Sequence, residues 1–344
     1  MKILFRADGN KDIGMGHIFR CLALADGLKQ HQGFLRMFFL TKYEEGVRVI
    51  REKGYPVIVA GEDDIRQIEE LAAEETLLIT DFLDTDTSYL GEIRKIRGLK
   101  LIAIDNNTDL KRLDADIVIN ANVFHDAKAL SADAPGYYLG PKYMVLNSRF
   151  NEARKAGKAI NDSIRDILIM SGGADSPNGH LTISSIRALE RIGEETRVHV
   201  IIGPAFAYMN LLDDLLKSTP RHFDVHVNPA DLVEIMQKAD IAITAAGIAL
   251  FELATLGVPC IVVPQVIPGM HHQLRCAEAF ERRGACLDLG QSPGSESICA
   301  KAALLIKDAS LRKRLSDNAR AFIDGRGLER VLGIILEACG LSAG

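Results

Sequence analysis

Short runs of apolar residues alternate along the chain with stretches in which apolar residues recur every three to four positions. Continuous Val/Ile/Leu runs are typical of buried parallel strands, and the amphipathic stretches are typical of the helices that connect them. The pattern predicts strands at Ile3–Arg6, Met37–Leu40, Val57–Ala60, Leu77–Thr80, Leu101–Ile104 and Ile117–Ile119, and helices at Ile18–Lys29, Glu44–Lys53, Ile65–Ala73 and Ser88–Arg97. Such alternation predicts a doubly wound parallel sheet.

The pattern starts again after Asn151–Ser163, a polar stretch without a strand signal. The second series predicts strands at Ile167–Met170, Val198–Ile202, Val225–Val227, Ile241–Thr244, Cys260–Val263 and Ala285–Leu287, and helices at Leu181–Arg191, Ala230–Lys238, Ile248–Leu256 and His272–Arg283. We therefore predict two Rossmann-like α/β domains, residues 1–150 and residues 151–344, the second of which carries the C-terminal helices. Their parallel sheets are expected to face each other across a cleft, with ligands at the carboxyl ends of the strands.

Length and composition agree with two globular domains, because the chain has 344 residues of which 47% are apolar and 25% charged. A net charge of −5 and the lack of a basic stripe argue against nucleic acid as a partner. The six cysteines form no C-x-x-C pair and are expected to be free thiols in a reducing compartment. No apolar run is long enough to span a membrane, so we expect a cytoplasmic protein without membrane insertion. The sequence does not determine the oligomeric state.

The first predicted strand is followed by a loop that contains Asp8, Gly14 and Gly16. Glycines let the backbone approach a ligand closely, and the free N–H groups of the helix that follows attract anions. The spacing does not match the G-x-G-x-x-G dinucleotide fingerprint, nor does the loop carry the Lys-Ser/Thr pair of a P-loop. An NAD-dependent dehydrogenase is therefore the least favoured class of enzyme.

His17 opens the helix after this loop. The positive end of a helix favours the neutral imidazole, which can accept a proton from water or from a sugar hydroxyl. One interpretation is a catalytic base, and the other is a histidine that only satisfies backbone groups at the helix start. Asp8 and Asp12 lie in the same loop and are candidates to orient it.

A second glycine-rich turn, Ser171–Asn178, follows the first strand of the second series. Asp175 or Ser176 can cap the next helix. Gly172 and Gly173 favour a ligand more strongly, because one glycine would suffice for a plain turn.

A third turn, Ala245-Ala246-Gly247, also opens a helix at a strand end and is suited to phosphate oxygens. Glu252 follows in an otherwise apolar stretch, where a carboxylate is costly without a partner. A ribose diol could supply two hydrogen bonds to it, and the alternative is an ion pair with a basic residue. In the fourth motif, His271-His272-Gln273, we expect Gln273 and one histidine to line the site and the other histidine to be solvated.

Several blocks together resemble a known family. They are Phe5-Arg6-Ala7-Asp8, Ile13-Gly14-Met15-Gly16-His17, Arg20-Cys21-Leu22, Leu24-Ala25, Gly140-Pro141-Lys142-Tyr143, Arg149-Phe150, Gly172-Gly173-Ala174-Asp175, Glu252-Leu253 and Leu256-Gly257-Val258-Pro259. The chain resembles the UDP-2,4-diacetamido-2,4,6-trideoxy-β-L-altropyranose hydrolases of pseudaminic acid biosynthesis (PseG-like). It is also similar to spore coat polysaccharide biosynthesis proteins of the SpsG type, and more distantly to MurG-type glycosyltransferases.

The resemblance implies a glycosyltransferase-B fold that binds UDP mainly in its second domain. By this resemblance Ala245, Ala246 and Gly247 receive the diphosphate, Glu252 the ribose, and Gly172 and Gly173 approach the nucleotide. His17 matches the family's catalytic base, which activates water without a metal or other cofactor. The remaining expected binding residues are Asp8, Gly14, Gly16, Arg20, Asp175, His272 and Gln273.

Two positions depart from the hydrolase pattern. The hydrolases usually carry Asp-His-Tyr after the fourth strand, where this chain has Asp81-Phe82-Leu83, and Asn before the late Gln, where it has His272. Leu83 and His272 therefore leave open both the identity of the sugar and whether the acceptor is water. The favoured function is hydrolysis of a UDP-sugar with His17 as base. The alternatives are a UDP-sugar glycosyltransferase for surface polysaccharide and a nucleotide-sugar-binding subunit without catalysis.

Overall fold

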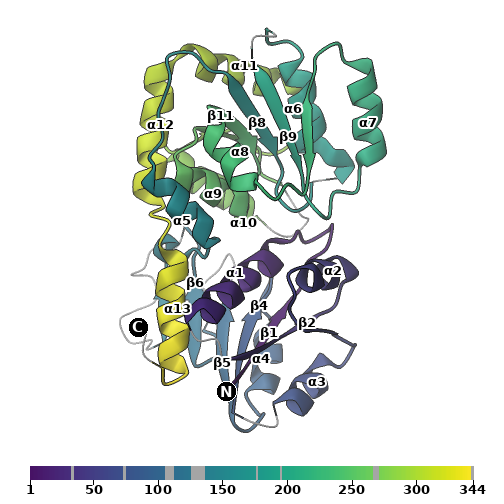
Figure 1. Ribbon diagram of the computed structural model, residues 1–344, viewed down its shortest axis with the longest axis vertical. Coiled ribbons are helices and arrows are strands. Elements are labelled where there is room, and N and C mark those ends of the chain that lie inside the picture. The colour runs from purple at the N-terminus through teal and green to yellow at the C-terminus, as the bar shows by residue number, and fades with distance from the viewer. Residues whose placement is uncertain are drawn as a thin grey trace. The chain divides into compact units, whose positions relative to one another are not determined.

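The computed structural model describes residues 1–31, 35–72, 75–104, 112–124, 136–175, 177–193, 196–265 and 271–341. The chain divides into two compact units (Figure 1). Unit 1 comprises Met1–Ser148 and Arg326–Gly344, and unit 2 comprises Arg149–Gly325. None of the described helices is both long and apolar enough to cross a membrane.

Unit 1 is built on a parallel sheet that has seven strands within its described residues, in the order β3-β2-β1-β4-β5-β6-β7. The strands are β1 (Lys2–Ala7), β2 (Arg36–Thr41), β3 (Val57–Val59), β4 (Thr76–Asp81), β5 (Leu99–Ile104), β6 (Ile117–Asn120) and β7 (Tyr137–Leu139). Its helices are α1 (Gly16–His31), α2 (Glu44–Glu52), α3 (Asp64–Leu71), α4 (Thr87–Ile93), the short 3₁₀ helix η1 (Pro141–Tyr143) and α13 (Gly327–Ala338). All six residues of β4 are buried, and its centre is the apolar run Leu77-Leu78-Ile79 that predicted the strand.

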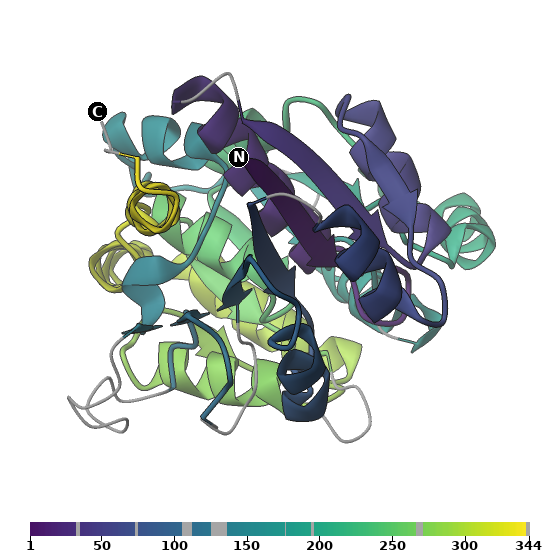
Figure 2. The same ribbon diagram turned by 90° about the horizontal axis from the view of Figure 1, so that it is seen from below.

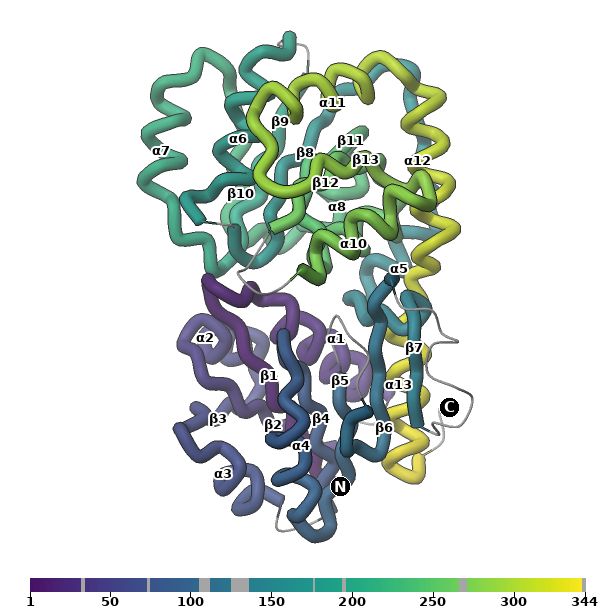
Figure 3. Tube along the Cα trace, turned by 180° about the vertical axis from the view of Figure 1, so that it is seen from behind, coloured from purple at the N-terminus to yellow at the C-terminus, as the bar shows by residue number. Residues whose placement is uncertain are grey.

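Unit 2 repeats this plan with a parallel sheet in the order β10-β9-β8-β11-β12-β13, six strands among the residues described (Figure 3). The strands are β8 (Asp166–Met170), β9 (Arg197–Ile202), β10 (Asp224–Val227), β11 (Ile241–Thr244), β12 (Cys260–Val262) and β13 (Leu287–Asp288). The helices are α5 (Ser148–Lys155), η2 (Pro177–Gly179), α6 (His180–Leu189), α7 (Met209–Ser218), α8 (Leu232–Lys238), α9 (Ile248–Leu256), α10 (His272–Glu281), α11 (Ser295–Lys307) and α12 (Ala309–Phe322). Alternate residues of the central strands, such as Ile167 and Ile169, pack with Leu181 of α6 and Ile298 of α11 in one core cluster.

The predicted fold class, two α/β domains with parallel sheets, is confirmed. The prediction omitted β7, α5 and α7. The stretch that forms α5 has Phe150 as its only buried residue among those described, so it lacks the apolar periodicity on which a helix prediction depends. Strand β7 consists of two half-buried tyrosines and one buried leucine, so it lacks the Val/Ile/Leu run on which the strand predictions depend.

The C-terminal helix differs from the expectation that residues 151–344 form one domain, because α13 belongs to unit 1. It runs along α1 in Figure 1 and is seen nearly end-on, in yellow, in Figure 2. A Cβ on Gly27 of α1 would lie 2.6 Å from a methyl carbon of Leu332, and a Cβ on Gly327 would lie 2.0 Å from the carbonyl oxygen of Met144. The apolar face of α13 can be read from the sequence, but its packing partners α1 and η1 cannot.

Candidate functional site

The carboxyl ends of β1 and β4 form the centre of the candidate site in unit 1. The strand order reverses between these neighbours, with β2 and β3 on one side and β5 to β7 on the other. Open α/β sheets bind their ligands at such switch points. Asp81, the last residue of β4, pairs in register with Ala7, the last residue of β1. The loop after β1 therefore starts beside Asp81.

This loop is closed by its own hydrogen bonds. Asn10 and Gly14 exchange two backbone hydrogen bonds, of 3.2 and 2.9 Å. The side-chain oxygen of Asn10 accepts the backbone N–H groups of Asp12 and Ile13, each at 2.9 Å. Gly14 has a φ of 81°, a value that glycine adopts without strain. The turn leads directly to Gly16, the first residue of α1.

His17 lies in the first turn of α1 and contacts Asp81. Its Nδ1 is 2.8 Å from Oδ1 of Asp81, and the His17 residue is 7% exposed while Asp81 is fully buried. Arg20, one helical turn later, donates to the same carboxylate from Nε at 2.6 Å and from Nη2 at 2.5 Å. The sequence-predicted residues His17 and Arg20 thus meet at a carboxylate that the sequence analysis did not select.

The protonation of Asp81 follows from its neighbours. Burial alone would raise its pKa, but the charge of Arg20 and the hydrogen bonds from His17 and Arg20 outweigh burial and hold the pKa at about 2. Asp81 is therefore a carboxylate near neutral pH, and a carboxylate only accepts hydrogen bonds. The hydrogen bond from His17 then requires the proton on Nδ1 and leaves Nε2 with a lone pair in the neutral ring. Within the described residues, Nε2 has no hydrogen-bond partner.

Asp8 and Asp12 do not orient His17. Asp8 instead forms an ion pair with Nη1 of Arg6 at 2.7 Å and accepts the backbone N–H of Lys42 at 2.8 Å, and Asp12 is exposed. The expectation from sequence proximity was wrong because the strand order places Asp81 of β4, 64 positions after His17, directly beside the loop. The signal available for Asp81 was an aspartate directly after the apolar run of a predicted buried strand.

A second buried network lies at the same sheet edge and was also not predicted. Nε of Arg6 donates to Asp64 at 2.6 Å, and the Tyr89 hydroxyl donates to the same oxygen at 3.1 Å. The Arg6 guanidinium lies over the Phe82 ring, 4.9 Å from its centroid. Burial opposes the charge of Arg6, but Asp8 and Asp64 outweigh it, so the pKa of Arg6 is raised. Phe82, at a position that departs from the hydrolase pattern, is thus used to pack this network.

In unit 2 the switch point lies between β8 and β11. The loop after β8 carries Gly172, with a φ of 100°, and Gly173. Oγ of Ser171, directly before them, is buried and has no hydrogen-bond partner among the described residues. The two glycines, predicted to approach the nucleotide, therefore stand at the sheet edge where a ligand is expected.

The carboxylate of Asp175 is engaged in hydrogen bonds within unit 2. It accepts the backbone N–H of Leu181 at 3.3 Å, and the N–H and hydroxyl of Thr182 at 3.0 and 2.6 Å. These groups belong to the first turn of α6, so Asp175 caps this helix, which was one of its two predicted roles. Ser176, the other capping candidate, lies outside the described residues, as does Ala73 at the end of a predicted helix.

Ala245, Ala246 and Gly247 join β11 to α9. Gly247 occupies the N-cap position of α9 and has no side chain to accept hydrogen bonds from the first N–H groups of this helix. The backbone N–H of Ala246 donates at 3.1 Å to Oε1 of Gln273, which lies in the first turn of α10. The structure thus brings together Ala246, Gly247 and Gln273, which the sequence places in separate motifs.

Glu252 lies in α9 and is half-buried between buried apolar residues. Neither a hydrogen bond nor an ion pair engages its carboxylate within the described residues, so the ion pair considered as its alternative role is not found there. Burial raises its pKa to about 7. His272 begins α10 and is half-buried, while His271 before it is exposed.

Three relatives share sequence with this chain. The spore coat polysaccharide biosynthesis protein SpsG of Bacillus subtilis is 28% identical over 338 residues, which are 96% of each chain. The UDP-2,4-diacetamido-2,4,6-trideoxy-β-L-altropyranose hydrolase of Campylobacter jejuni is 30% identical over 190 residues, 54% of this chain and 65% of the hydrolase. The uncharacterized protein MJ1062 of Methanocaldococcus jannaschii is 31% identical over 275 residues, 77% of this chain but 56% of MJ1062.

Residues 167–324, which lie within unit 2, match the glycosyltransferase family 28 C-terminal domain. MurG of Acinetobacter baumannii has the same fold, with a TM-score of 0.66 at 16% identity over 98% of this chain and all of MurG. HepE of Anabaena, solved with UDP-glucose, has a TM-score of 0.60 at 15% identity over 98% of this chain and all of HepE. The chain has a glycosyltransferase-B fold. The predicted resemblance to SpsG and to the hydrolases is confirmed.

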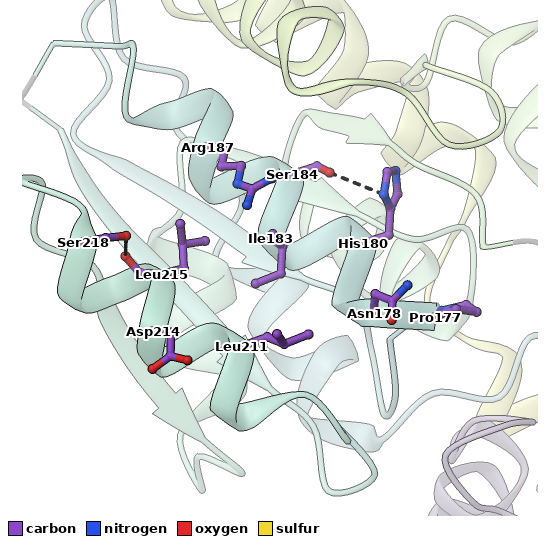
Figure 4. A pocket seen from close by; sticks show the side chains of 10 residues that line it. All are labelled: Pro177, Asn178, His180, Ile183, Ser184, Arg187, Leu211, Asp214, Leu215 and Ser218. Atoms are coloured by element: carbon purple, nitrogen blue, oxygen red, sulfur yellow. Dashed lines mark hydrogen bonds between the residues drawn. The ribbon is translucent and has the colours of Figure 1, made fainter.

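A groove of about 530 Å³ opens between α6 and α7 (Figure 4). Ile183, Leu211 and Leu215 form its apolar lining, with Arg187 and Asp214 among the polar residues around them. It contains none of the sequence-predicted site residues, so we place the candidate site at the strand ends instead. Among the described residues, no group of His, Cys, Asp and Glu could hold a metal ion.

Proposed function

We propose that the protein hydrolyses a UDP-linked sugar, of the diacetamido-trideoxy class or a related one, for nonulosonic acid or surface polysaccharide biosynthesis. The observation that carries this proposal is the buried contact between Nδ1 of His17 and Oδ1 of Asp81. Because Asp81 is ionised, we infer a proton on Nδ1 of His17 and a lone pair on Nε2. Such a pair is suited to general base catalysis, because the carboxylate fixes the tautomer and stabilises the imidazolium that forms. The relationship to the Campylobacter hydrolase supports a UDP-sugar as substrate.

In the proposed reaction Nε2 of His17 accepts a proton from water while the water oxygen attacks the anomeric carbon. The bond between that carbon and the β-phosphate oxygen breaks, and UDP departs with the electron pair. In the proposal, the backbone N–H groups at the start of α9 and the glycine pair Gly172 and Gly173 meet the diphosphate charge. The half-buried, unpaired Glu252 accepts the ribose hydroxyls, whose two donors would offset the cost of its burial.

A glycosyltransferase is the second candidate, and Leu83 favours it. Leu83 stands where the hydrolases usually carry a tyrosine, and it cannot hold a water molecule by a hydrogen bond. The full-length similarity to SpsG and the shared fold with MurG support the same alternative. His17 would then deprotonate a sugar hydroxyl in place of water, with the same leaving group.

The test measures UDP release from candidate UDP-sugars with and without sugar acceptors. Hydrolysis predicts release from a UDP-diacetamido sugar in buffer alone, and transfer predicts release only with an acceptor. His17→Ala should abolish turnover and retain UDP binding. His31→Ala, an exposed histidine at the other end of α1, is the matched control and should keep full activity. Full turnover in His17→Ala would overturn the proposed base, and UDP binding without turnover of any candidate would indicate a binding subunit.

A further inference from the structure

One glutamine side chain joins two loops at the carboxyl edge of the unit 2 sheet. Oε1 of Gln273 accepts the backbone N–H of Ala246 at 3.1 Å and the backbone N–H of Gln265 at 2.9 Å. Ala246 belongs to the loop after β11, and Gln265 to the loop after β12. A side-chain carbonyl oxygen has two lone pairs, and both are used here to hold backbone. Gln273 is therefore a cross-link between the two loops and α10.

A second glutamine extends this link to a third loop. Nε2 of Gln265 lies 3.4 Å from the carbonyl oxygen of Ala174 and 3.4 Å from Oδ1 of Asp175, both in the loop after β8. These distances are long for hydrogen bonds, so each contributes less than the two bonds to Gln273. The loop after β9 contacts the same segment, because the backbone N–H of Ala205 donates to the carbonyl oxygen of Gly173 at 2.9 Å.

The linked loops are those that carry the proposed diphosphate-binding groups. Backbone N–H groups bind an anion well only when they are fixed before the ligand arrives, since ordering a loop during binding costs free energy. Gln273 also faces Gly247, whose Cβ position would be 3.8 Å from Nε2 of Gln273. The side chains of Gln265 and Gln273 thus hold the loops that contain Gly172, Gly173, Ala246 and Gly247. In this role they do not themselves contact the diphosphate.

We propose that Gln265 and Gln273 are positioning residues, which fix the loops after β8, β11 and β12 in the arrangement that receives the diphosphate of the nucleotide. This inference rests on the proposed function, because it presumes that unit 2 binds UDP. It assigns to Gln265 a role in the site that the sequence motifs did not indicate. It also assigns to Gln273 the role of holding backbone in addition to lining the site.

The test compares the affinities of UDP and uridine by isothermal titration calorimetry in the full-length protein. Gln273→Met removes both accepted hydrogen bonds and should weaken UDP binding about tenfold while leaving uridine binding unchanged. Gln265→Met should have the same effect but smaller. The loss in the double variant should differ from the product of the single losses, because the residues share one network. Gln291→Met, at an exposed position, is the matched control and should behave as the wild type.

A purely structural role would lower the melting temperature and weaken UDP and uridine in proportion, and an unchanged ratio of their affinities in Gln273→Met would overturn the inference. In the ligand-free protein, Gln273→Met should also accelerate amide hydrogen exchange at Ala246 and Gln265, and unchanged protection there would contradict the cross-link. Wild-type protein that binds neither UDP nor any UDP-sugar would overturn the proposed function and this inference together. Tight UDP binding with an unaltered ratio in the variants would overturn the inference alone.

Discussion

Nδ1 of His17 lies 2.8 Å from Oδ1 of Asp81, and this contact joins the start of α1 to the end of β4. Arg20 approaches the same nitrogen of His17 at 3.3 Å, but an arginine only donates, so this approach cannot be a hydrogen bond when Nδ1 carries a proton. The carboxylate of Asp81 therefore decides the tautomer of His17, and Arg20 keeps that carboxylate charged. The helix start alone, from which the sequence analysis argued, would not have selected one ring nitrogen over the other.

Asp81→Asn should lower turnover about 10²- to 10⁴-fold, the usual contribution of general base catalysis. The asparagine amide can donate to Nδ1 of His17, which would place the proton on Nε2 and remove the base. UDP affinity should stay within about twofold of the wild type, because in the proposed function unit 2 binds the nucleotide. Steady-state kinetics and calorimetry would measure the two quantities separately.

The same substitution leaves Arg20 buried without its carboxylate, so it should also destabilise unit 1 by about 3–5 kcal/mol. Kinetic constants must therefore be normalised to the folded fraction from urea unfolding. Asp84→Asn, at an exposed position three residues later, is the control and should change neither activity nor stability. Unchanged kcat in folded Asp81→Asn would contradict the orienting role of Asp81.

Glu252 should make the stability of the ligand-free protein depend on pH. Its pKa is raised from 4.5 to about 7 in the folded protein by burial, so the folded state binds more protons than the unfolded state between these values. Stability from this group is therefore present at low pH and is lost as pH rises from about 4.5 through 7, by up to about 3 kcal/mol. Glu252→Gln should remove this slope, measured by urea unfolding from pH 5 to 8, whereas exposed Glu296→Gln should keep it.

Ligand binding should show the opposite dependence on pH. If ribose hydroxyls donate to Glu252, UDP binds the ionised carboxylate better, and its affinity should rise as pH increases from 6 to 8. The Glu252→Gln variant should bind UDP more weakly and lose this rise. A UDP affinity that is independent of pH in both proteins would exclude the ribose contact.

The sequence determines the elements better than it determines which of them meet. Hydrophobic periodicity predicted the strands around Asp81 and the loop before His17, because buried parallel strands have a distinct pattern. It could not show that Asp81 lies beside His17, because β1 and β4 are made neighbours by strand order, which no local pattern encodes. Arg6 and Tyr89 were missed for the same reason, since they meet through Asp64 on a third element. Glu252 could be selected as a candidate from the sequence because a carboxylate in an apolar helix is anomalous within its own segment.

Gly203→Ala should disrupt the loops of unit 2. A Cβ at this position would lie 2.2 Å from the carbonyl oxygen of Gly172 and 2.7 Å from the carbonyl carbon of Gly173, which are backbone atoms that cannot turn away. We expect a loss of about 1–3 kcal/mol in the free energy of unfolding and weaker UDP binding. Gly91→Ala, inside α4, has no atom of the described residues within 4 Å of its Cβ position apart from its own stretch of helix, and should leave stability unchanged or raise it by about 0.5–1 kcal/mol. Equal effects of the two substitutions would contradict the close approach at Gly203.

Leu332→Ala should destabilise unit 1, because Leu332 on α13 packs into that unit. Leu332 is 5% exposed and packs against Gly27 of α1, so its truncation should cost about 2–5 kcal/mol. Hydrogen exchange measured by mass spectrometry should accelerate in α1 and stay unchanged in α12, which precedes α13 in sequence but belongs to unit 2. Leu304→Ala, a leucine on α11 that is 43% exposed, should alter neither pattern. Faster exchange in α12 with unchanged exchange in α1 would contradict the assignment of α13 to unit 1. It would support the second domain of residues 151–344 that the sequence pattern predicted.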